Sequence, residues 1–488
     1  MAIKLVYDIF GPSGPFANGW NYNYLEDAWN HNFSIDHNLI ENFNKKYTHL
    51  SVYDCNLNLS TQGVDKIHIS DITTNREKTR AYHKSDSDDI FLYTIHPFGS
   101  IDTCLGNNLN YHQNTHCFEF ISIYAKNYIK NLDNFYLTID YSSEGDIRFD
   151  LFENLHNICY KLNINPSKVI IITSAMNTRD LYQKYLDKNP QQTQFYTAYY
   201  PWPILPKRGE MRTYFENREN FTFNGFQNKI SFMSLDEYNL NFKRDKKCLI
   251  FNRRTAPHRV ILLSLLENDK LLENVEYSID LSMWKHSDVG LELSSGTDYD
   301  KNPYITDKTY KSKMINGVFN LKKINKKTVD YDDINGVWGF GFEHKESYLK
   351  TYFSVITETI FYEHGHYISE KTFKGIQHLH PFVILGKPGI LKYLKSKGFQ
   401  TFSEFWDESY DDIQNNSERM IKVYELIKNL ILKTDEEWVE LNKKILPILL
   451  HNRKVLLSFD EEYVNNTYIN NLNKLLENEP NQENYSLF

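Results

Sequence analysis

Three arginines gather at one junction of the sequence. Arg253 and Arg254 follow the apolar run 248–251, and Arg259 lies in the apolar stretch that begins at Pro257. A proline in this position is typical of the first turn of a helix. Cations near the positive N-terminal end of a helix cost a few tenths to about 1 kcal/mol unless an anion binds there. The junction therefore predicts an anion site, and a phosphate is the anion that fits best.

A second polar group comes later in the chain. Glu358 ends one apolar run, and Ser369, Glu370 and Lys371 precede a helical pattern and the apolar run 382–385. Together with the three arginines, these residues look like a donor site for a nucleotide sugar. The alternative is that both groups are ordinary solvated ends of helices on an α/β scaffold.

The elements expected in the first half alternate between strands and helices. The β-branched run 169–172 is typical of a parallel strand buried on both faces, and helical spacing over 149–162 predicts a helix before it. Such alternation predicts an open parallel sheet with ligands at the carboxyl ends of its strands. The expected strands are residues 4–10, 47–53, 90–95, 134–140 and 168–173.

A second α/β series starts near residue 246. Residues 282–350 lack a clear period and are expected to form loops with short helices, whereas the region after residue 417 has amphipathic helical faces. The expected strands are 248–251, 274–280, 352–358 and 382–385, and the expected helices are 257–266, 370–380 and 389–396.

Three segments of this second series resemble the donor-binding part of GT-B glycosyltransferases, particularly of the α1,3-fucosyltransferase type. They are residues 353–358, 367–373 and 380–386, which correspond to a Phe-Glu-Asn-Ser-like strand, a Tyr-Val-Thr-Glu-Lys helix start and a Pro-Val-Val-like strand. The Asn-Arg-Arg and Pro-His-Arg pair also resembles phage and bacterial proteins of presumed sugar-transfer function. The resemblance covers about residues 246–412. Thr359-Ile360 replaces the family's Asn-Ser, so the donor sugar and base stay open.

The resemblance implies an α/β fold of two Rossmann-like domains facing across a cleft, with C-terminal helices. We expect an acceptor-side domain at 1–235, a donor domain at 236–430 and a helical tail at 431–488. The resemblance also implies that Glu370 binds ribose hydroxyls and that Lys371 and an arginine contact the diphosphate. The implied activity is metal-independent transfer of a sugar from a UDP- or GDP-linked donor to a glycan or other hydroxyl acceptor, with no further cofactor.

An inverting transfer also needs a catalytic base. A carboxylate at a strand end of the first domain would supply it, and Asp8, Asp140 and Glu144 are so placed. Asp140 is the best of these by position. A turn that caps a helix is an equally good interpretation of residues 140–145.

Other patterns leave alternatives open. Asp86-Ser87-Asp88 resembles the Asp-x-Asp with which metal-dependent GT-A transferases bind Mg²⁺ or Mn²⁺, although a solvated turn is favoured here because the motif precedes a strand. The loop 11–16 follows the first strand but lacks a phosphate-binding glycine motif, and is expected to line an acceptor cleft. The pairs 364/366 and 378/380 are two His-x-His pairs that could in principle bind zinc. A non-catalytic nucleotide- or glycan-binding protein of the same fold is a further alternative.

The overall amino-acid composition limits the classes of function that fit this chain. The 488 residues carry 55 Lys and Arg against 63 Asp and Glu, a net charge of −8, which does not favour binding to nucleic acid. Five cysteines without a CxxC pair fit reduced thiols, and neither a membrane span nor an export sequence is visible. We expect a cytoplasmic protein, located in the host cytoplasm if the source is viral. Viral and bacterial sources both fit the resemblance, and the sequence does not indicate an oligomeric state.

Overall fold

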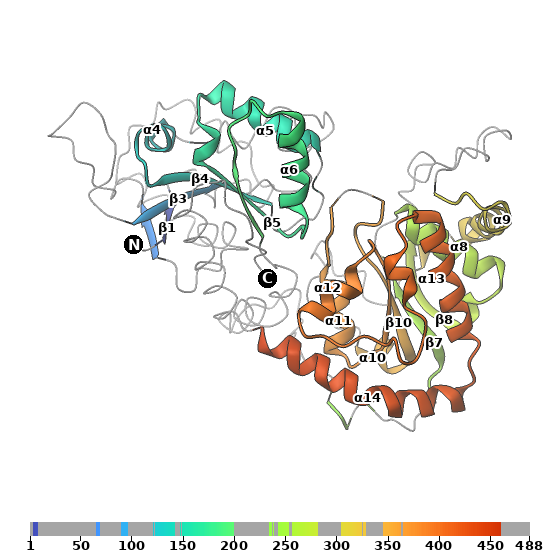
Figure 1. The fold of residues 1–488 in the computed structure, drawn as a ribbon. Coiled ribbons are helices and arrows are strands. Elements are labelled where there is room, and N and C mark those ends of the chain that lie inside the picture. The colour runs from blue at the N-terminus through green and yellow to red at the C-terminus, as the bar shows by residue number, and fades with distance from the viewer. Residues whose placement is uncertain are drawn as a thin grey trace. The chain divides into compact units, whose positions relative to one another are not determined.

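The computed structural model describes most of the second half of the chain and selected parts of the first. The described residues are 3–7, 65–68, 89–95, 121, 123–141, 147, 149–199, 234–236, 238, 243–252, 256–281, 304–324, 326–327, 345–362 and 365–459. The chain divides into two compact units (Figure 1). Unit 1 contains Met1–Trp202, Glu363–His366 and Asp460–Phe488, and unit 2 contains Pro203–Tyr362 and Tyr367–Phe459.

Unit 1 is built on a parallel sheet with the strand order β2-β1-β3-β4-β5-β6. Every residue of β5 is buried, as its β-branched sequence predicts. Helices α5 and α6 pack together through aromatic rings, with the Phe152 and Tyr182 centroids 4.8 Å apart. The elements are β1 (Ile3–Tyr7), β2 (Asp65–His68), β3 (Ile90–Ile95), α4 (Ile123–Asn131), β4 (Phe135–Tyr141), α5 (Phe149–Leu162), a 3₁₀ turn (Pro166–Lys168), β5 (Val169–Thr173), α6 (Thr178–Lys188) and β6 (Tyr196–Tyr199).

A short segment from the second half of the sequence belongs to unit 1. The backbone N–H of Met176 donates to the His366 carbonyl at 2.7 Å, and the His366 N–H donates to Asn177 Oδ1 at 2.8 Å. These two bonds fix His366 beside the turn that follows β5.

Unit 2 contains a five-stranded sheet with the order β11-β10-β7-β8-β9. The first four strands are parallel, and the two-residue β9 pairs antiparallel with β8. The elements are β7 (Lys246–Phe251), α8 (Pro257–Asn268), a 3₁₀ turn (Leu272–Asn274), β8 (Val275–Asp280), α9 (Lys308–Ile324), β9 (Lys326–Lys327), α10 (Lys345–Leu349), β10 (Thr351–Thr357), α11 (Glu370–Gln377), β11 (Phe382–Leu385), α12 (Ile390–Ser396), a 3₁₀ turn (Ser409–Asp412), α13 (Asn416–Ile431) and α14 (Asp435–Ser458).

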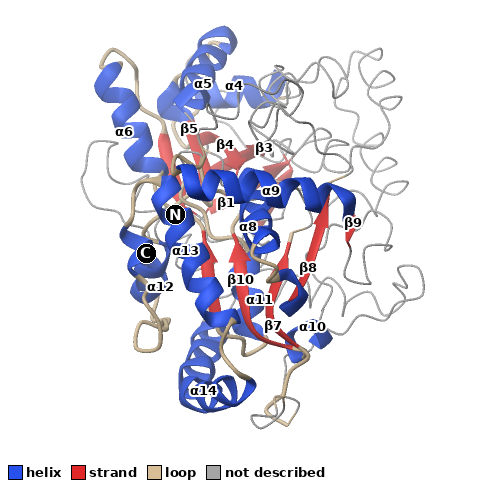
Figure 2. Cartoon of the chain, turned by 90° about the vertical axis from the view of Figure 1, so that its right-hand side faces the viewer, coloured by secondary structure: helices blue, strands red, loops and turns tan. Residues whose placement is uncertain are grey.

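In unit 2, helix α9 packs on helix α8, and helix α14 packs on strand β10 (Figure 2). Helix α9 lies directly against α8, so closely that a Cβ added to Gly317 would lie 1.8 Å from the carbonyl oxygen of Ser264. Trp438 of α14 is fully buried and stacks on Phe353 of β10, with ring centroids 5.1 Å apart. None of the helices within the described ranges is long and apolar enough to cross a membrane.

The α/β class predicted from the sequence is confirmed, because each unit contains a mainly parallel, Rossmann-like sheet and the described C-terminal part consists of helices. The expectation of short helices in 282–350 is wrong for α9, which has 17 residues. The expected strand 47–53 lies outside the described residues. The expected domain boundary at residue 235 adjoins residues that the structure does not describe, so the domain limits stay predictions.

Candidate functional site

The topology of unit 2 marks one edge of its sheet. The chain passes from β7 to β8 on one side and later returns to β10 on the other side of β7. At such a reversal of strand order, the connections that follow two neighbouring parallel strands run in opposite directions. Ligands of α/β proteins bind at the carboxyl ends of these two strands. The carboxyl ends of β7 and β10 therefore define the candidate site.

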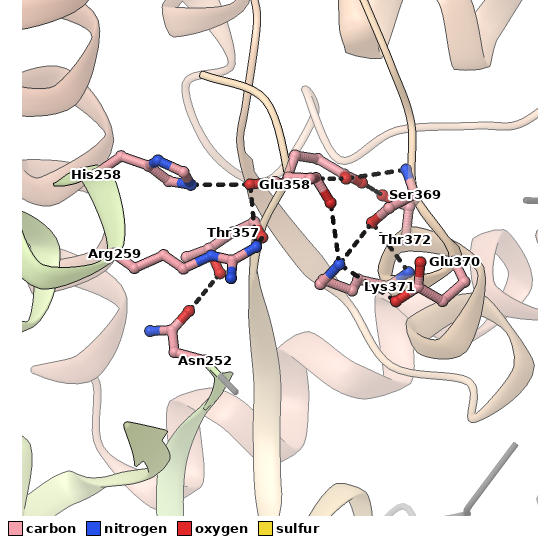
Figure 3. Close-up of polar contacts among 10 residues, drawn as sticks. Asn252, His258, Arg259, Thr357, Glu358, Ser369, Glu370, Lys371 and Thr372 are labelled. Carbon is pink, nitrogen blue, oxygen red and sulfur yellow. Dashed lines mark hydrogen bonds and ion pairs between the residues drawn. The ribbon is translucent and has the colours of Figure 1, made fainter. Parts of the chain in front are cut away.

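Asn252 immediately follows β7 and is completely buried. Its Oδ1 accepts a hydrogen bond from Thr357 Oγ1 at 2.6 Å, and its backbone N–H donates to Ser278 Oγ at 3.1 Å (Figure 3). No hydrogen-bond partner for its Nδ2 is found among the residues that the structure describes. A buried donor without a partner costs about 1–3 kcal/mol, so this amide is suited to an acceptor that a ligand brings.

The N-terminus of α8 comes four residues after Asn252. Its N-cap is Ala256, which has no side chain that could accept a hydrogen bond, and Pro257 follows at the first helical position. The first turn contains no acidic residue. Within the part of the chain that the structure describes, no side chain caps the positive end of α8, as expected where an anion binds.

His258 and Arg259 of α8 point back at the end of β10 (Figure 3). His258 Nε2 donates to the Glu358 carbonyl at 2.8 Å, and Arg259 Nη2 lies 3.3 Å from the Thr357 carbonyl and 3.4 Å from that of Glu358. Burial, the neighbouring Arg259 charge and the more distant Lys371 charge lower the pKa of His258 to about 3, although its hydrogen bond opposes this. The imidazole is neutral at physiological pH and serves as a donor that holds this segment in place.

Glu358 connects the end of β10 to the start of α11. It is fully buried, and its carboxylate accepts hydrogen bonds from Thr372 Oγ1 at 2.7 Å, from the Ser369 N–H at 2.9 Å and from the Thr359 N–H at 3.3 Å. Gly386 leaves room for it, because a Cβ there would lie 3.2 Å from Glu358 Cβ. A negative charge at the positive end of α11 is stabilised by the helix dipole and by these donors.

Ser369 and Lys371 complete the start of α11. Ser369 is the N-cap residue and its Oγ accepts from the Lys371 N–H at 3.4 Å. Lys371 Nζ lies 3.2 Å from Ser369 Oγ, 3.3 Å from Thr359 Oγ1 and 3.2 Å from Glu370 Oε1. The Lys371 side chain keeps 27% of its surface exposed, so this ammonium group is accessible to a ligand.

The two helix N-termini of the site thus differ in a way that bears on binding. The end of α11 already has the Glu358 carboxylate and the Ser369 hydroxyl as acceptors. Among the described residues no side chain caps the start of α8, and its N-cap residue comes four positions after Asn252, whose Nδ2 has no described partner. An anion is therefore better accommodated at α8, with Lys371 at the margin.

The structure brings together five of the predicted site residues. Glu358 joins the two groups, because its carbonyl contacts Arg259 and its carboxylate contacts the start of α11. The five are Arg259, Glu358, Ser369, Glu370 and Lys371 (Figure 3).

The remaining predicted residues cannot be placed in the same way. Arg253, Arg254, Asp8 and Glu144 lie outside the described residues, as do Asp86 and Asp88. Asp140 belongs to β4 of unit 1, but its side chain is not among those described.

Sequence reasoning did not single out Asn252 or His258 as functional residues. The sequence feature that could have identified Asn252 is its position, since a polar amide directly follows a buried strand at the predicted junction. The role of His258 depends on its partner, the Glu358 carbonyl, which is distant in sequence.

The histidines of the second His-x-His pair are used inside the protein. Burial lowers the pKa of His380 to about 3, and its ring accepts from Ser354 Oγ at 2.5 Å and donates to the Thr351 carbonyl at 2.8 Å. His378 stacks on Tyr348 with ring centroids 4.4 Å apart. Across the described ranges, no group of three or more His, Cys, Asp or Glu side chains could hold a metal ion.

Comparisons with known proteins add little to this geometry. Neither the models of known protein families nor the curated protein sequences give a match. Among solved structures, similarity is found to the Candida albicans trehalose-6-phosphate phosphatase N-terminal domain, with a TM-score of 0.35, 11% identity and coverage of 79% of this chain and 70% of that chain. A trehalose 6-phosphate synthase from Burkholderia multivorans gives a TM-score of 0.37 and 8% identity over 80% of this chain and 71% of that chain. A further trehalose-6-phosphate synthase gives 0.36 and 10% over 94% and 98%. Scores and identities this low carry no argument about activity.

Proposed function

We propose that the protein is a GT-B glycosyltransferase that transfers a sugar from a nucleoside diphosphate sugar, UDP- or GDP-linked, to a hydroxyl acceptor. In this proposal the diphosphate binds at the carboxyl ends of β7 and β10. The resemblance of residues 246–412 to the donor-binding part of such enzymes suggests the activity, and the local chemistry of the site supports it.

The observation that carries the proposal is the pairing of Asn252 with the start of α8. A buried Nδ2 without a described partner and a helix N-terminus without a side-chain cap lie a few residues apart. Phosphate oxygens accept hydrogen bonds and carry negative charge, so one phosphate group would satisfy both features. An apolar ligand would leave the Asn252 amide unpaired.

Cations around the site would stabilise the leaving group. Arg253 and Arg254 follow Asn252 directly in the sequence, and Lys371 offers an accessible ammonium group. Fixed cations can neutralise the charge that develops on a departing diphosphate, which makes a metal ion unnecessary for this step. Arg259 would contribute mainly through its charge, because its guanidinium group is buried and holds the carbonyls at the end of β10.

The two glutamates of the site would have different roles. Glu370 would accept hydrogen bonds from ribose hydroxyls, as the family resemblance implies. Glu358 would position α11 and Lys371, because its carboxylate is fully buried and already accepts from Ser369 and Thr372.

The reaction would proceed by displacement at the anomeric carbon. The acceptor oxygen forms a bond to that carbon, the bond from the carbon to the phosphate oxygen breaks, and the nucleoside diphosphate leaves with the electron pair. In an inverting reaction a carboxylate of unit 1 takes the acceptor proton, and Asp140, Glu144 and Asp8 remain the proposed candidates.

Calorimetric titration of the full chain with UDP, GDP, CDP and TDP tests the proposal. One of them should bind, and the matching sugar nucleotide should be slowly hydrolysed without an acceptor, also in the presence of EDTA. Binding without hydrolysis or transfer would indicate a non-catalytic nucleotide-binding protein. A requirement for Mn²⁺ would indicate a metal-dependent transferase, and the absence of any binding would refute the proposed site.

A further inference from the structure

One segment of the chain leaves unit 2 and returns to it. Residues 363–366 belong to unit 1, whereas the residues directly before and after them belong to unit 2. Both ends of this excursion lie in the candidate site, because Glu358 directly follows β10 and Ser369 is the N-cap residue of α11. The Ser369 N–H donates to the Glu358 carboxylate at 2.9 Å, which joins the two ends. We call residues 359–368 the connecting segment.

Two hydrogen bonds in unit 1 fix the tip of the connecting segment. The Met176 N–H donates to the His366 carbonyl at 2.7 Å, and the His366 N–H donates to Asn177 Oδ1 at 2.8 Å. Both backbone polar groups of His366 are therefore bonded to two consecutive residues. Only two residues, both buried, separate His366 from Ser369, which leaves the chain little slack. A displacement of His366 would therefore also displace the start of α11.

The side chain of Asn177 serves this contact and does not cap its own helix. Asn177 is the N-cap residue of α6, a position at which asparagine ordinarily accepts a hydrogen bond from an N–H of the first turn. In α6 it makes no such capping bond. Its Oδ1 accepts instead from His366, which is 189 residues away in the sequence. Asn177 thus stabilises the connecting segment in place of its own helix.

Hydrogen bonds also fix the turn that carries Asn177. The Thr178 hydroxyl donates to the Ala175 carbonyl at 2.8 Å, and the hydroxyl oxygens of Thr173 and Thr178 lie 2.6 Å apart. Thr173, at the end of β5, is fully buried, and Ala175 is nearly so. The turn is therefore a firm support that holds His366 in one position.

We propose that Asn177 is a positioning residue for the nucleotide site. The inference rests on the proposed function, in which Lys371 contributes to binding of the diphosphate. By holding His366, Asn177 fixes the connecting segment in the arrangement that places Ser369 at the start of α11, with its Oγ 3.2 Å from Lys371 Nζ. Nucleotide binding and the hydrogen bonds of His366 then favour each other, because two events that stabilise the same arrangement are coupled reciprocally.

Calorimetric titration of the full chain tests this role, with the nucleoside diphosphate that binds best among UDP, GDP, CDP and TDP. Asn177→Ala removes the acceptor of the His366 N–H and should weaken nucleotide binding about fivefold, the effect of one hydrogen bond. Asn177→Asp keeps a side-chain oxygen at this position and should restore most of the affinity. Asn189→Ala is the matched control, because it removes the 2.9 Å hydrogen bond from Asn189 Nδ2 to the Tyr185 carbonyl at the other end of α6. This control should bind like the wild type.

Amide hydrogen exchange provides a second measurement that needs no variant. A saturating concentration of the same nucleotide should slow exchange of the Met176 and His366 amides about fivefold in the wild type, by the reciprocity of the coupling. The Asn189 amide, which donates to the Leu186 carbonyl at the end of α6, should exchange at an unchanged rate.

The results distinguish this inference from the proposed function. If no nucleoside diphosphate binds to the wild type, the proposed function is refuted and the inference is refuted with it. If the nucleotide binds equally to the wild type and to Asn177→Ala, or leaves the Met176 and His366 amides unchanged, only the role of Asn177 is refuted. An equal loss of affinity in Asn189→Ala, or no recovery in Asn177→Asp, would also refute that role, because the effect would then come from general destabilisation of unit 1.

Discussion

Replacing Glu358 tests how the start of α11 is held. Glu358 is fully buried and its two shortest hydrogen bonds come from Thr372 Oγ1 at 2.7 Å and the Ser369 N–H at 2.9 Å. We predict that Glu358→Ala destabilises this region much more than Glu358→Gln. Alanine leaves both donors without an acceptor, whereas glutamine can accept from Ser369 with its carbonyl oxygen and donate to the Thr372 hydroxyl.

The magnitude follows from these two bonds. A hydrogen bond to a charged group contributes about 1.5–3 kcal/mol, so losing two predicts a loss of about 3–5 kcal/mol for alanine after partial relaxation. The third bond, from the Thr359 N–H, is 3.3 Å long and adds little. Glutamine keeps the geometry but loses the charge, which predicts a loss of about 1–2 kcal/mol.

Amide hydrogen exchange measures this loss where it occurs. In Glu358→Ala the amides of α11 should exchange about 100-fold or more faster, since every 1.4 kcal/mol is about tenfold. The amides of α14 provide an internal control for global unfolding. The reasoning would be refuted if α11 exchanged at the wild-type rate in the alanine variant, or if glutamine were as disruptive as alanine.

Three further predictions concern binding, packing and pH. Lys371→Met should weaken binding of the nucleoside diphosphate by about 1–3 kcal/mol in calorimetry, whereas Lys443→Met, on the exposed side of α14, should bind like wild type. Gly317→Ala should lower the free energy of unfolding by about 3 kcal/mol or more in urea titrations, because its Cβ would collide with α8, and the exposed neighbour variant Asn316→Ala should have little effect. The unfolded chain protonates His380 below pH 6.5 while the folded protein keeps it neutral down to about pH 3, so stability is lost as the pH falls through this range. His380→Gln should reduce that dependence by about 1.4 kcal/mol per pH unit, and an unchanged slope would contradict the buried neutral state.

Much of the fold could be predicted from hydrophobic periodicity. The bounds of β3 and β11 match the expected strands, and α5 matches its expected range, because these segments combine a clear period with distinct ends. Helix α9 was missed since its lysines obscure the apolar face, and α8, against which it packs closely, is distant in sequence.

The site could be predicted in part. The residue types at the ends of β7 and β10 indicated that cations and carboxylates would meet, and Arg259, Glu358 and Lys371 do lie in one network. The roles of individual side chains in the site could not be predicted from the sequence. Glu358 is fully buried, and the amide of Asn252 lacks a described partner. Both features depend on contacts between segments that are far apart in the chain.

A crystal structure with a bound nucleoside diphosphate would test the central claim most directly. We predict that a phosphate oxygen lies within about 3.2 Å of Asn252 Nδ2 and faces the N-terminus of α8, with Lys371 at the margin of the diphosphate. A nucleotide bound elsewhere, or with its phosphates directed away from Asn252, would contradict the account.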